Sequence, residues 1–407
     1  MQLLSLAMKN VLRYRHRTWV TVLAMAFAGG IMIFYAGLVE GWLGAMETNA
    51  VSMEMGEIQV HARGYRDDPD LYTVIPDYRS VVSQADSLGL VASARLLGGG
   101  LAAAHENSTG VGIRGIDLET EKQVVLLQNH VFSGTWLTAA GSRQVVLGYW
   151  LAKILDVQPG SEIVLVGQAA DGSMANDLFI VQGVLKSVAQ GIDRGGLIMS
   201  EQDFRDFFVL PEGVHEIVLK RVADDVPIEQ AVEELATAFP ELEVLSWRQL
   251  QPTLARLLDL SDVSMIIMLM ITYAAVGMLT MNAMLMGVFE RIPVFGVMKA
   301  IGFSGVKLFF LIFCETLVLV SMASVLAFAL GTPLSYFFET HPIDFSFFLS
   351  ESSTIAGVAF EPQWYCVVTL NSIVMPVLFL YIVSLVSILY PAWKAARISP
   401  VEAIHHR

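Results

Sequence analysis

The residues that could carry chemistry in this 407-residue chain are the few charged side chains that interrupt its apolar runs. Glu290, Arg291 and Lys299 lie in the segment ERIPVFGVMKAIGFS, and Glu315 lies in the apolar run that follows. An ionisable side chain inside such a run indicates a functional site, although Lys307, about two turns away, could also pair with it structurally. The chemistry expected here is binding at a membrane surface.

The sequence lacks the motifs of an enzyme. It contains no G-x-x-x-x-G-K-[ST] nucleotide-binding motif and no H-E-x-x-H metal motif, and its eight histidines are scattered. Cys314 and Cys366 lie in apolar runs and are interpreted as packing residues, not as a disulfide framework. We therefore predict no catalytic residue, no metal ligand and no cofactor bound by this chain.

Four apolar runs are long enough to cross a membrane. The chain is 55% hydrophobic and 16% charged, against roughly 25% charged residues in a typical soluble domain. A hydrocarbon core of ~30 Å requires about 20 helical residues. Runs of this length occupy residues 18–39, 264–289, 308–338 and 364–390. The first run is too long for the apolar part of a signal peptide, so we expect a retained anchor.

Small side chains mark one face of the third run. Ala323, Ala327 and Gly331 follow at four-residue spacing, a stripe that permits close helix contact. This contact could serve association of two copies or packing within one chain.

The Lys and Arg residues outside 40–263 indicate the orientation. They occur in residues 1–17, 290–307 and 391–407, whereas residues 339–363 contain none. The positive-inside rule therefore places both termini and 290–307 in the cytoplasm, and 40–263 and 339–363 outside. Residues 1–17 mix apolar and basic side chains at roughly helical spacing, which fits either a helix in the cytoplasmic interface or a plain cationic flank.

Residues 40–263 are long enough to form a domain with its own core. Alternation at 58–62 predicts a half-buried strand, and VPIEQAVEELATAF predicts a helix that begins near Pro227. The segment holds 32 Asp and Glu against 15 Lys and Arg, which argues against nucleic-acid binding. The predicted fold class is a polytopic α-helical membrane protein with four transmembrane helices and a large extracytoplasmic α+β domain between the first two.

The 290–307 loop is predicted to contain a short helix. Pro293 suits the first turn of a helix, and Gly302 suits the position just after its end. Phe295, Met298 and Ile301 would give this helix apolar contact faces, which a merely solvated turn would not need. The helix is therefore expected to lie against something at the membrane surface.

ERIPVFGVMKAIGFS resembles the coupling helix of the FtsX-like, MacB/LolCDE-type ABC transporter permeases, with the pattern E-R-x-x-E-I-G-x-x-[RK]-A-x-G-x-S. The chain end, YPAWKAARISPVEAIHH, is similar to the closing P-A-x-[RK]-A-A-x-x-x-P-x-E-A-[LI] of that family. VVLGYWLAKILDVQPGSEIVLV looks like its MacB-like periplasmic core domain. One departure is that Val294 and Phe295 stand where the family has Glu and Ile, so an apolar contact replaces a charged one.

The resemblance implies site residues at the matching positions. Those implied for ATPase coupling are Glu290, Arg291, Pro293, Phe295, Gly296, Met298, Lys299 and Gly302. Those of the cytoplasmic C-terminal motif are Pro391, Lys394, Arg397, Pro400 and Glu402, and the intramembrane candidate is Glu315.

The resemblance also implies a mechanism and partners. A separate cytoplasmic ABC ATPase dimer, which binds ATP and Mg, would push on the 290–302 helix, and the second span would transmit this motion to the outward domain. A second permease copy, identical or related, membrane lipid, and a periplasmic or outer-membrane lipoprotein or carrier are the other implied partners. The expected location is the inner membrane.

The layout is similar to that of the LolC/LolE lipoprotein-release permeases. Extraction of a lipoprotein or lipid-like substrate toward the outer membrane is therefore the first functional hypothesis. Efflux through a tripartite assembly, and FtsX-like regulation of cell-wall hydrolases without transport, remain alternatives. What the outward domain binds would discriminate between them.

Overall fold

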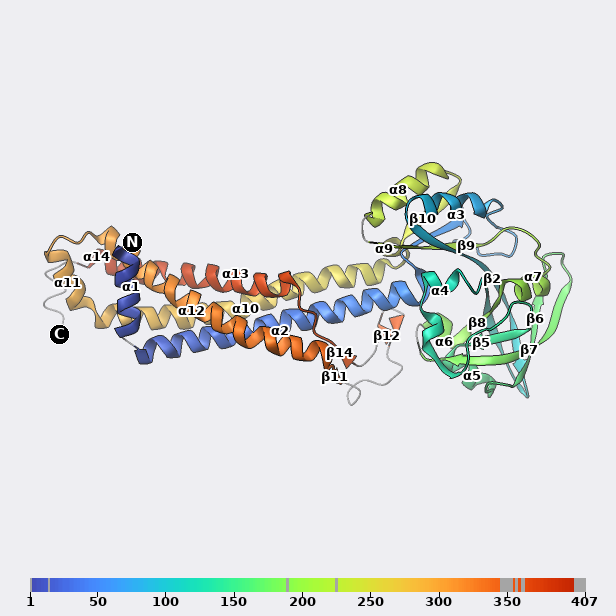
Figure 1. Cartoon of the computed structure of the whole chain (residues 1–407), viewed down its shortest axis with the longest axis horizontal. Coiled ribbons are helices and arrows are strands. Elements are labelled where there is room, and N and C mark those ends of the chain that lie inside the picture. The colour runs from blue at the N-terminus through green and yellow to red at the C-terminus, as the bar shows by residue number, and fades with distance from the viewer. Residues whose placement is uncertain are drawn as a thin grey trace. The chain divides into compact units, whose positions relative to one another are not determined.

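The computed structural model describes residues 2–13, 15–187, 190–223, 226–344, 354–355, 358–359 and 363–398 (Figure 1). The chain divides into two compact units. Unit 1 contains Met1–Leu43, Leu258–Phe345 and Gln363–Arg407, and unit 2 contains Gly44–Leu257 and Ser346–Pro362. Unit 1 thus holds all four apolar runs, and unit 2 holds most of the acidic segment.

Long helices carry the four apolar runs. They are α2 (Arg15–Ala50), α10 (Pro252–Glu290), α12 (Gly305–Thr340) and α13 (Leu370–Ser387). Four helical stretches along them are long and apolar enough to cross a membrane: Thr18–Met55, Pro252–Glu290, Gly305–Thr340 and Leu370–Arg397. The short helices of unit 1 are α1 (Gln2–Arg13) before α2, α11 (Ile292–Ala300) between α10 and α12, and α14 (Leu389–Arg397) directly after α13. Helices α2 and α10 extend beyond the apolar runs predicted for them.

The fourth long helix, α13, begins later than the predicted run at 364–390. Gln363–Trp364 forms the short strand β14, which pairs with β11 (Ile343–Asp344), and helix α13 starts only at Leu370. Thr369 ends the extended segment because its side chain accepts a hydrogen bond from the Ser372 amide, while the Ser372 hydroxyl accepts one from the Thr369 amide.

The stripe of small residues on α12 packs against α2. A Cβ atom added at Gly331 would lie 2.7 Å from the carbonyl oxygen of Gly30, and one added at Gly29 would lie 2.8 Å from Cβ of Ala327. Backbones at such a distance leave no space for larger side chains. Of the two alternatives raised by the sequence, this contact is packing within one chain.

Unit 2 is built around a ten-stranded sheet of order β10-β1-β9-β2-β3-β8-β5-β7-β4, with β6 paired to β2 and β7. Its strands are β1 (Ile58–Ala62), β2 (Leu90–Ala104), β3 (Asn107–Ile116), β4 (Val131–Gly134), β5 (Gln144–Leu147), β6 (Glu162–Gln168), β7 (Met174–Leu185), β8 (Gly196–Ser200), β9 (Glu216–Arg221) and β10 (Leu242–Ser246). A further short hairpin joins β12 (Thr354–Ile355) to β13 (Val358–Ala359).

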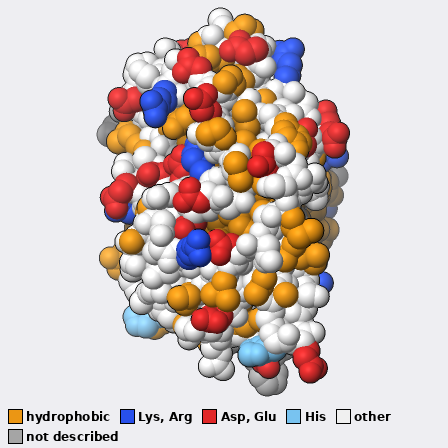
Figure 2. Space-filling model, turned by 90° about the vertical axis from the view of Figure 1, so that its right-hand side faces the viewer, with side chains coloured by type: hydrophobic (Ala, Val, Ile, Leu, Met, Phe, Trp, Pro, Cys, Tyr) orange, Lys and Arg blue, Asp and Glu red, His pale blue; other side chains and the backbone are white. Residues whose placement is uncertain are grey.

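Helices cover parts of this sheet, so unit 2 has the predicted α+β character. The α-helices are α3 (Tyr78–Ser87), α4 (Glu121–Val124), α5 (Tyr149–Leu155), α6 (Gln190–Gly195), α7 (Glu201–Phe208), α8 (Ile228–Ala238) and α9 (Trp247–Leu250). A π-helix, η1 (Val51–Met55), and a 3-10 helix, η2 (Leu127–His130), complete the unit. Figure 2 shows acidic side chains interspersed with apolar ones over one face of the molecule, as expected for a solvated acidic surface.

Candidate functional site

Helix α11 and the turn after it form the predicted site in the 290–307 loop. Pro293 occupies the first turn of α11, where its missing N–H group costs no hydrogen bond. Gly302 follows the helix with a φ of +96°, which glycine adopts without steric cost. The amide of Phe303 donates to the carbonyl oxygen of Met298 at 2.9 Å, closing the turn. The predicted limits of this helix are therefore confirmed.

A buried ion pair fastens the start of α11 to α12. The Arg291 guanidinium donates to both carboxylate oxygens of Glu315, at 2.9 and 2.6 Å, and Asn10 of α1 donates to the same carboxylate at 2.6 Å. Glu315 is 5% exposed. A bidentate, charge-assisted pair of this kind fixes orientation as well as distance. Glu315 therefore pairs with Arg291 instead of Lys307, and the pair joins three elements of unit 1.

A second contact fastens the end of α11 to α14. The Lys299 ammonium donates to the carbonyl oxygens of Ala396 at 2.6 Å and of Ile398 at 2.7 Å. These carbonyls end α14, where the helix presents unpaired acceptors and partial negative charge. A Cβ atom at Gly305 would lie 2.6 Å from the Ala396 oxygen, so the first residue of α12 also lies close to α14. The two motifs recognised in the sequence thus form one structure.

The C-terminal motif is described only in part. Pro391 is buried in α14, the Lys394 ammonium lies 4.5 Å from the ring centroid of Phe289, and the Arg397 guanidinium lies 4.2 Å from that of Trp393. These are cation–π distances. Pro400 and Glu402 lie outside the described residues.

The solvent-exposed side of α11 is apolar. Val294, Val297 and Ile301 are 53%, 55% and 82% exposed, and their i, i+3, i+7 spacing places them on one side of the helix. Phe295 is only 2% exposed and packs in the core of unit 1, with the Arg291 guanidinium 5.1 Å from its ring centroid. We name Val294, Val297 and Ile301 the apolar face of α11.

The predicted coupling residues differ in burial. Phe295 and Gly296 are buried within unit 1. Glu290, Pro293 and Gly302 are exposed, and Met298 and Lys299 are half-buried. In the sequence, the exposed apolar side of α11 was indicated by Val294, which stands where the family pattern has Glu.

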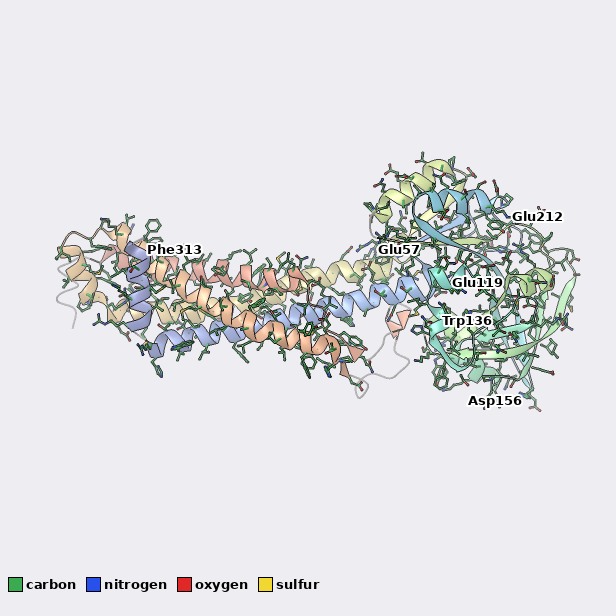
Figure 3. All side chains as sticks on the ribbon, in the orientation of Figure 1. Glu57, Glu119, Trp136, Asp156, Glu212 and Phe313 are labelled. Carbon is green, nitrogen blue, oxygen red and sulfur yellow. The ribbon has the colours of Figure 1, made fainter. Side chains whose placement is uncertain are left out.

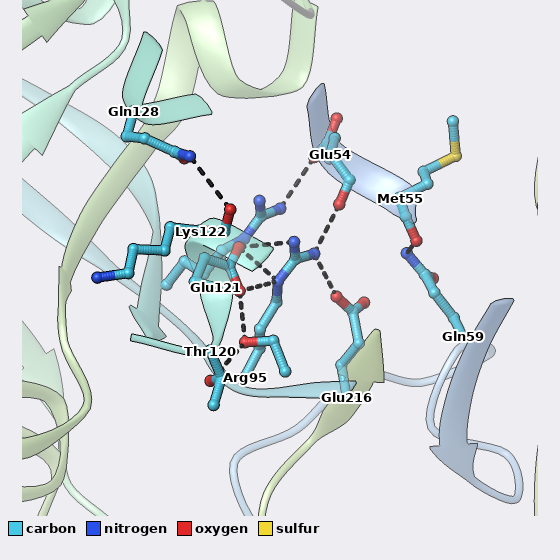
Figure 4. A network of polar contacts seen from close by, with 11 residues as sticks. Glu54, Met55, Gln59, Arg95, Thr120, Glu121, Lys122, Gln128 and Glu216 are labelled. Carbon is cyan, nitrogen blue, oxygen red and sulfur yellow. Dashed lines mark hydrogen bonds and ion pairs between the residues drawn. The ribbon is translucent and has the colours of Figure 1, made fainter. Parts of the chain in front are cut away.

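Unit 2 contains a buried polar network that the sequence did not reveal (Figure 4). Arg95 on β2 is fully buried and donates to Glu121 of α4 at 2.7 Å, to Glu216 of β9 at 2.8 Å and to the carbonyl oxygen of Glu54 at 2.6 Å. Two carboxylates therefore flank one buried guanidinium. Burial alone would lower the pKa of Arg95, but the charges of Glu121 and Glu216 raise it. The Glu54 contact ties the end of η1 to the sheet.

The same network sets the charge state of Glu216. Burial alone would raise the pKa of this carboxyl, but the hydrogen bond from His61 at 3.2 Å and the charge of Arg95 lower it to about 2. Glu216 is therefore ionised in the folded protein at neutral pH.

The chain enters and leaves unit 2 through neighbouring strands. β1, which follows η1, pairs antiparallel with β10, which precedes α9 and α10, in the register Ile58↔Ser246. The amide of Trp247 donates to the Glu57 carbonyl oxygen at 2.9 Å, and the Glu57 carboxylate, labelled in Figure 3, binds Arg221 at 2.8 Å. The segments that continue α2 and lead into α10 are thus directly hydrogen bonded within unit 2.

Two family models match the chain. The MacB-like periplasmic core domain matches residues 18–238, more than half of the chain, and the FtsX-like permease C-terminal domain matches residues 266–400. The chain belongs to the MacB/FtsX family of ABC transporter permeases. Membership confirms the resemblance and the fold class predicted from the sequence. It also implies an ABC ATPase partner, a dimeric assembly and a multi-pass location in the inner membrane.

Solved extracytoplasmic domains are similar to part of this permease. The extracellular domain of the noncanonic ABC-type transporter YknZ from Gram-positive bacteria is 16% identical, with 47% of this chain and 100% of that chain covered and a TM-score of 0.34. The periplasmic region of MacB from Actinobacillus actinomycetemcomitans is 14% identical, with 51% and 95% covered and a TM-score of 0.36. A comparison with curated proteins finds no match.

Proposed function

We propose that this permease works by mechanotransmission with a separate cytoplasmic ATPase, which binds ATP and Mg and docks on the apolar face of α11. The observation that carries the proposal is the contrast between the two sides of this helix. Its inner side is fixed through the Arg291–Glu315 pair and the Lys299 contacts, while Val294, Val297 and Ile301 are exposed. A helix held at both ends transfers a displacement to the elements that hold it.

The length of α10 supports transmission across the membrane. Its 39 residues span about 60 Å at a rise of 1.5 Å per residue, roughly twice the thickness of a ~30 Å hydrocarbon core. A push on α11 would therefore reach β10 through one continuous helix and the short α9. The distribution of Lys and Arg supports the orientation, with both termini and α11 in the cytoplasm and unit 2 on the outer side.

The proposed cargo is a lipoprotein or lipid-like molecule moved from the inner membrane toward the outer membrane. The similarity of the layout to that of the LolC/LolE lipoprotein-release permeases supports this choice. Four spans are too few to enclose a route, so a second permease copy completes the proposed assembly, and a periplasmic or outer-membrane lipoprotein or carrier would receive the cargo.

Co-purification of the full-length protein from its native membrane, in mild detergent, tests the coupling proposal. We expect a Walker-motif ATPase to co-purify with the wild type and to be lost from Val297→Glu/Ile301→Glu, because a carboxylate buried in an apolar contact is strongly unfavourable. Val222→Glu is the matched control, since Val222 is 73% exposed in unit 2. Equal recovery of the ATPase with both variants would contradict docking on α11.

The proteins that co-purify through unit 2 in the same experiment test the proposed identity of the cargo. A lipoprotein carrier supports the proposal. A periplasmic adaptor would indicate tripartite efflux, and a cell-wall hydrolase would indicate regulation without transport.

A further inference from the structure

A groove of about 630 Å³ lies between α2 and α10 in unit 1. Its long walls are apolar, and small alanines from both helices keep it open. Its lining residues are Arg13, Arg15, His16, Val20, Thr21, Ala24, Leu279, Ala283, Met286 and Glu290. Binding sites for small molecules have volumes of roughly 300–1,000 Å³ and mostly apolar walls, which this groove matches.

The walls of the groove belong to membrane-spanning segments. Val20, Leu279 and Met286 are 57%, 44% and 61% exposed in helices long and apolar enough to cross a membrane. Ala24 and Ala283 are half-buried between them. In a bilayer, the molecules that can reach this surface carry hydrocarbon chains, so the long part of the groove suits an acyl chain.

One end of the groove is basic. Arg13, Arg15 and His16 lie at the corner between α1 and α2 with exposed side chains, and Glu290 is the acidic residue in the lining. Arg15 and Glu290 each make a further interaction within the chain. Two guanidinium groups against one carboxylate leave the lining of this end with net positive charge. This end therefore complements an anionic headgroup.

We infer that this groove binds an anionic phospholipid, with its phosphate at Arg13, Arg15 and His16 and one acyl chain along Val20, Ala24 and Ala283. The combination of a basic rim and an apolar groove favours this occupant, because a neutral helix or a zwitterionic lipid would leave the positive charge unbalanced. Basic pockets between spans on the cytoplasmic side are suited to acidic headgroups. The leaflet follows from the proposed orientation, which places this end in the cytoplasmic leaflet.

The position of the groove gives the lipid a connection to α11. Thr21, Ala283 and Glu290 also line a smaller cavity, of about 50 Å³, whose other walls include Arg291 and Glu315. A headgroup at the basic rim therefore lies next to the ion pair that fastens α11. Lipid occupancy can in this way influence the helix on which the ATPase is proposed to dock.

Native mass spectrometry of the full-length protein tests the site. The protein is reconstituted in nanodiscs of equimolar phosphatidylglycerol and phosphatidylcholine with identical acyl chains, and the lipids retained after transfer to detergent are counted. We expect preferential retention of phosphatidylglycerol, reduced about fivefold by Arg13→Gln, since each basic residue near a membrane surface contributes on the order of 1 kcal/mol. Lys9→Gln is the matched control, because Lys9 is exposed on α1 but does not line the groove.

A second pair of variants tests the acyl-chain part of the groove. Ala283→Trp fills the groove and should abolish retention of either lipid, whereas Ala275→Trp, at an exposed position of α10 outside the groove, should not.

Retention without preference for phosphatidylglycerol, or an equal loss with Lys9→Gln, would overturn the inference. So would a loss of dimer with unchanged lipid retention in Ala283→Trp, which would show that a second copy covers the groove. The lipid count does not depend on ATPase binding, so it can fail independently of the proposed function.

Discussion

Glu315 is the residue on which the position of α11 most depends. Its carboxylate accepts hydrogen bonds from Arg291 and Asn10, so elements from three parts of the chain meet at one side chain. Removing one member of a buried ion pair leaves the other charge uncompensated.

We predict that Glu315→Gln lowers the stability of the permease by about 3 kcal/mol, because the Arg291 charge loses its partner. Replacing both residues, in Arg291→Met/Glu315→Met, should restore most of this loss, since no buried charge remains. Thermal unfolding of the detergent-solubilised Arg291→Met, Glu315→Met and double variants, analysed with the wild type as a double-mutant cycle, measures the coupling. Additive effects of the two single changes would contradict a direct pair.

A different residue-scale prediction concerns pH. The pKa of Glu216 is lowered from 4.5 to about 2 in the folded protein. The folded state therefore binds fewer protons than the unfolded state between these values, and the stability that Glu216 contributes is fully present above about pH 4.5. It is lost progressively as the pH falls toward 2.

We expect thermal unfolding of unit 2 in the full-length protein to shift to lower temperature between pH 5 and pH 3, on the order of several degrees. Glu216→Gln should be less stable at neutral pH and should flatten this dependence. Glu212→Gln, at an exposed position, is the control. An unchanged pH profile in Glu216→Gln would show that another group causes the acid sensitivity.

At the scale of elements, the close approach of α12 to α2 determines how unit 1 packs. We predict that Gly331→Leu destabilises unit 1 by about 1–3 kcal/mol, since the backbone of Gly30 cannot move aside as a flexible side chain would. Ala329→Leu is the matched control on the exposed side of the same helix. Equal unfolding temperatures of the two variants would contradict the importance of this contact.

The sequence predicted elements better than the contacts between them. Pro293 and Gly302 define the limits of α11 because helix starts and ends have local chemical requirements. The acceptor of Lys299 could not be predicted, because it is a pair of backbone carbonyls that carry no side-chain signal. Arg291 and Glu315 were both identified as site residues, but their pairing depends on the turn that brings α12 back alongside α10.

The buried network of unit 2 was missed for a related reason. Arg95 lies among small and apolar residues of β2, and a single charge in a strand does not indicate its partners. Glu216 lies far from it in the chain and is brought to it by the pairing of β9 with β2, whereas Glu121 is brought to it by the packing of α4 on the sheet. Exposure was equally hard to predict, as the burial of Phe295 shows.

At the scale of the whole molecule, the described residues of the permease combine helix α11, four helices long and apolar enough to cross a membrane, and a MacB-like domain in which β1 and β10 are paired. In the proposed mechanism, an ATPase moves α11, α10 carries the motion, and β10 receives it. The docking of the ATPase on α11 is the central claim, because without it the outward domain has no source of movement.

Site-specific photo-crosslinking from position 297 in native membranes, followed by mass spectrometry, tests this claim most directly. A photoreactive amino acid at Val297 should capture a Walker-motif ATPase, and the same probe at Val222 should not. Capture of the ATPase at position 297 would establish the docking face. A properly inserted, folded protein whose position 297 captures only lipid, or nothing, would contradict the account.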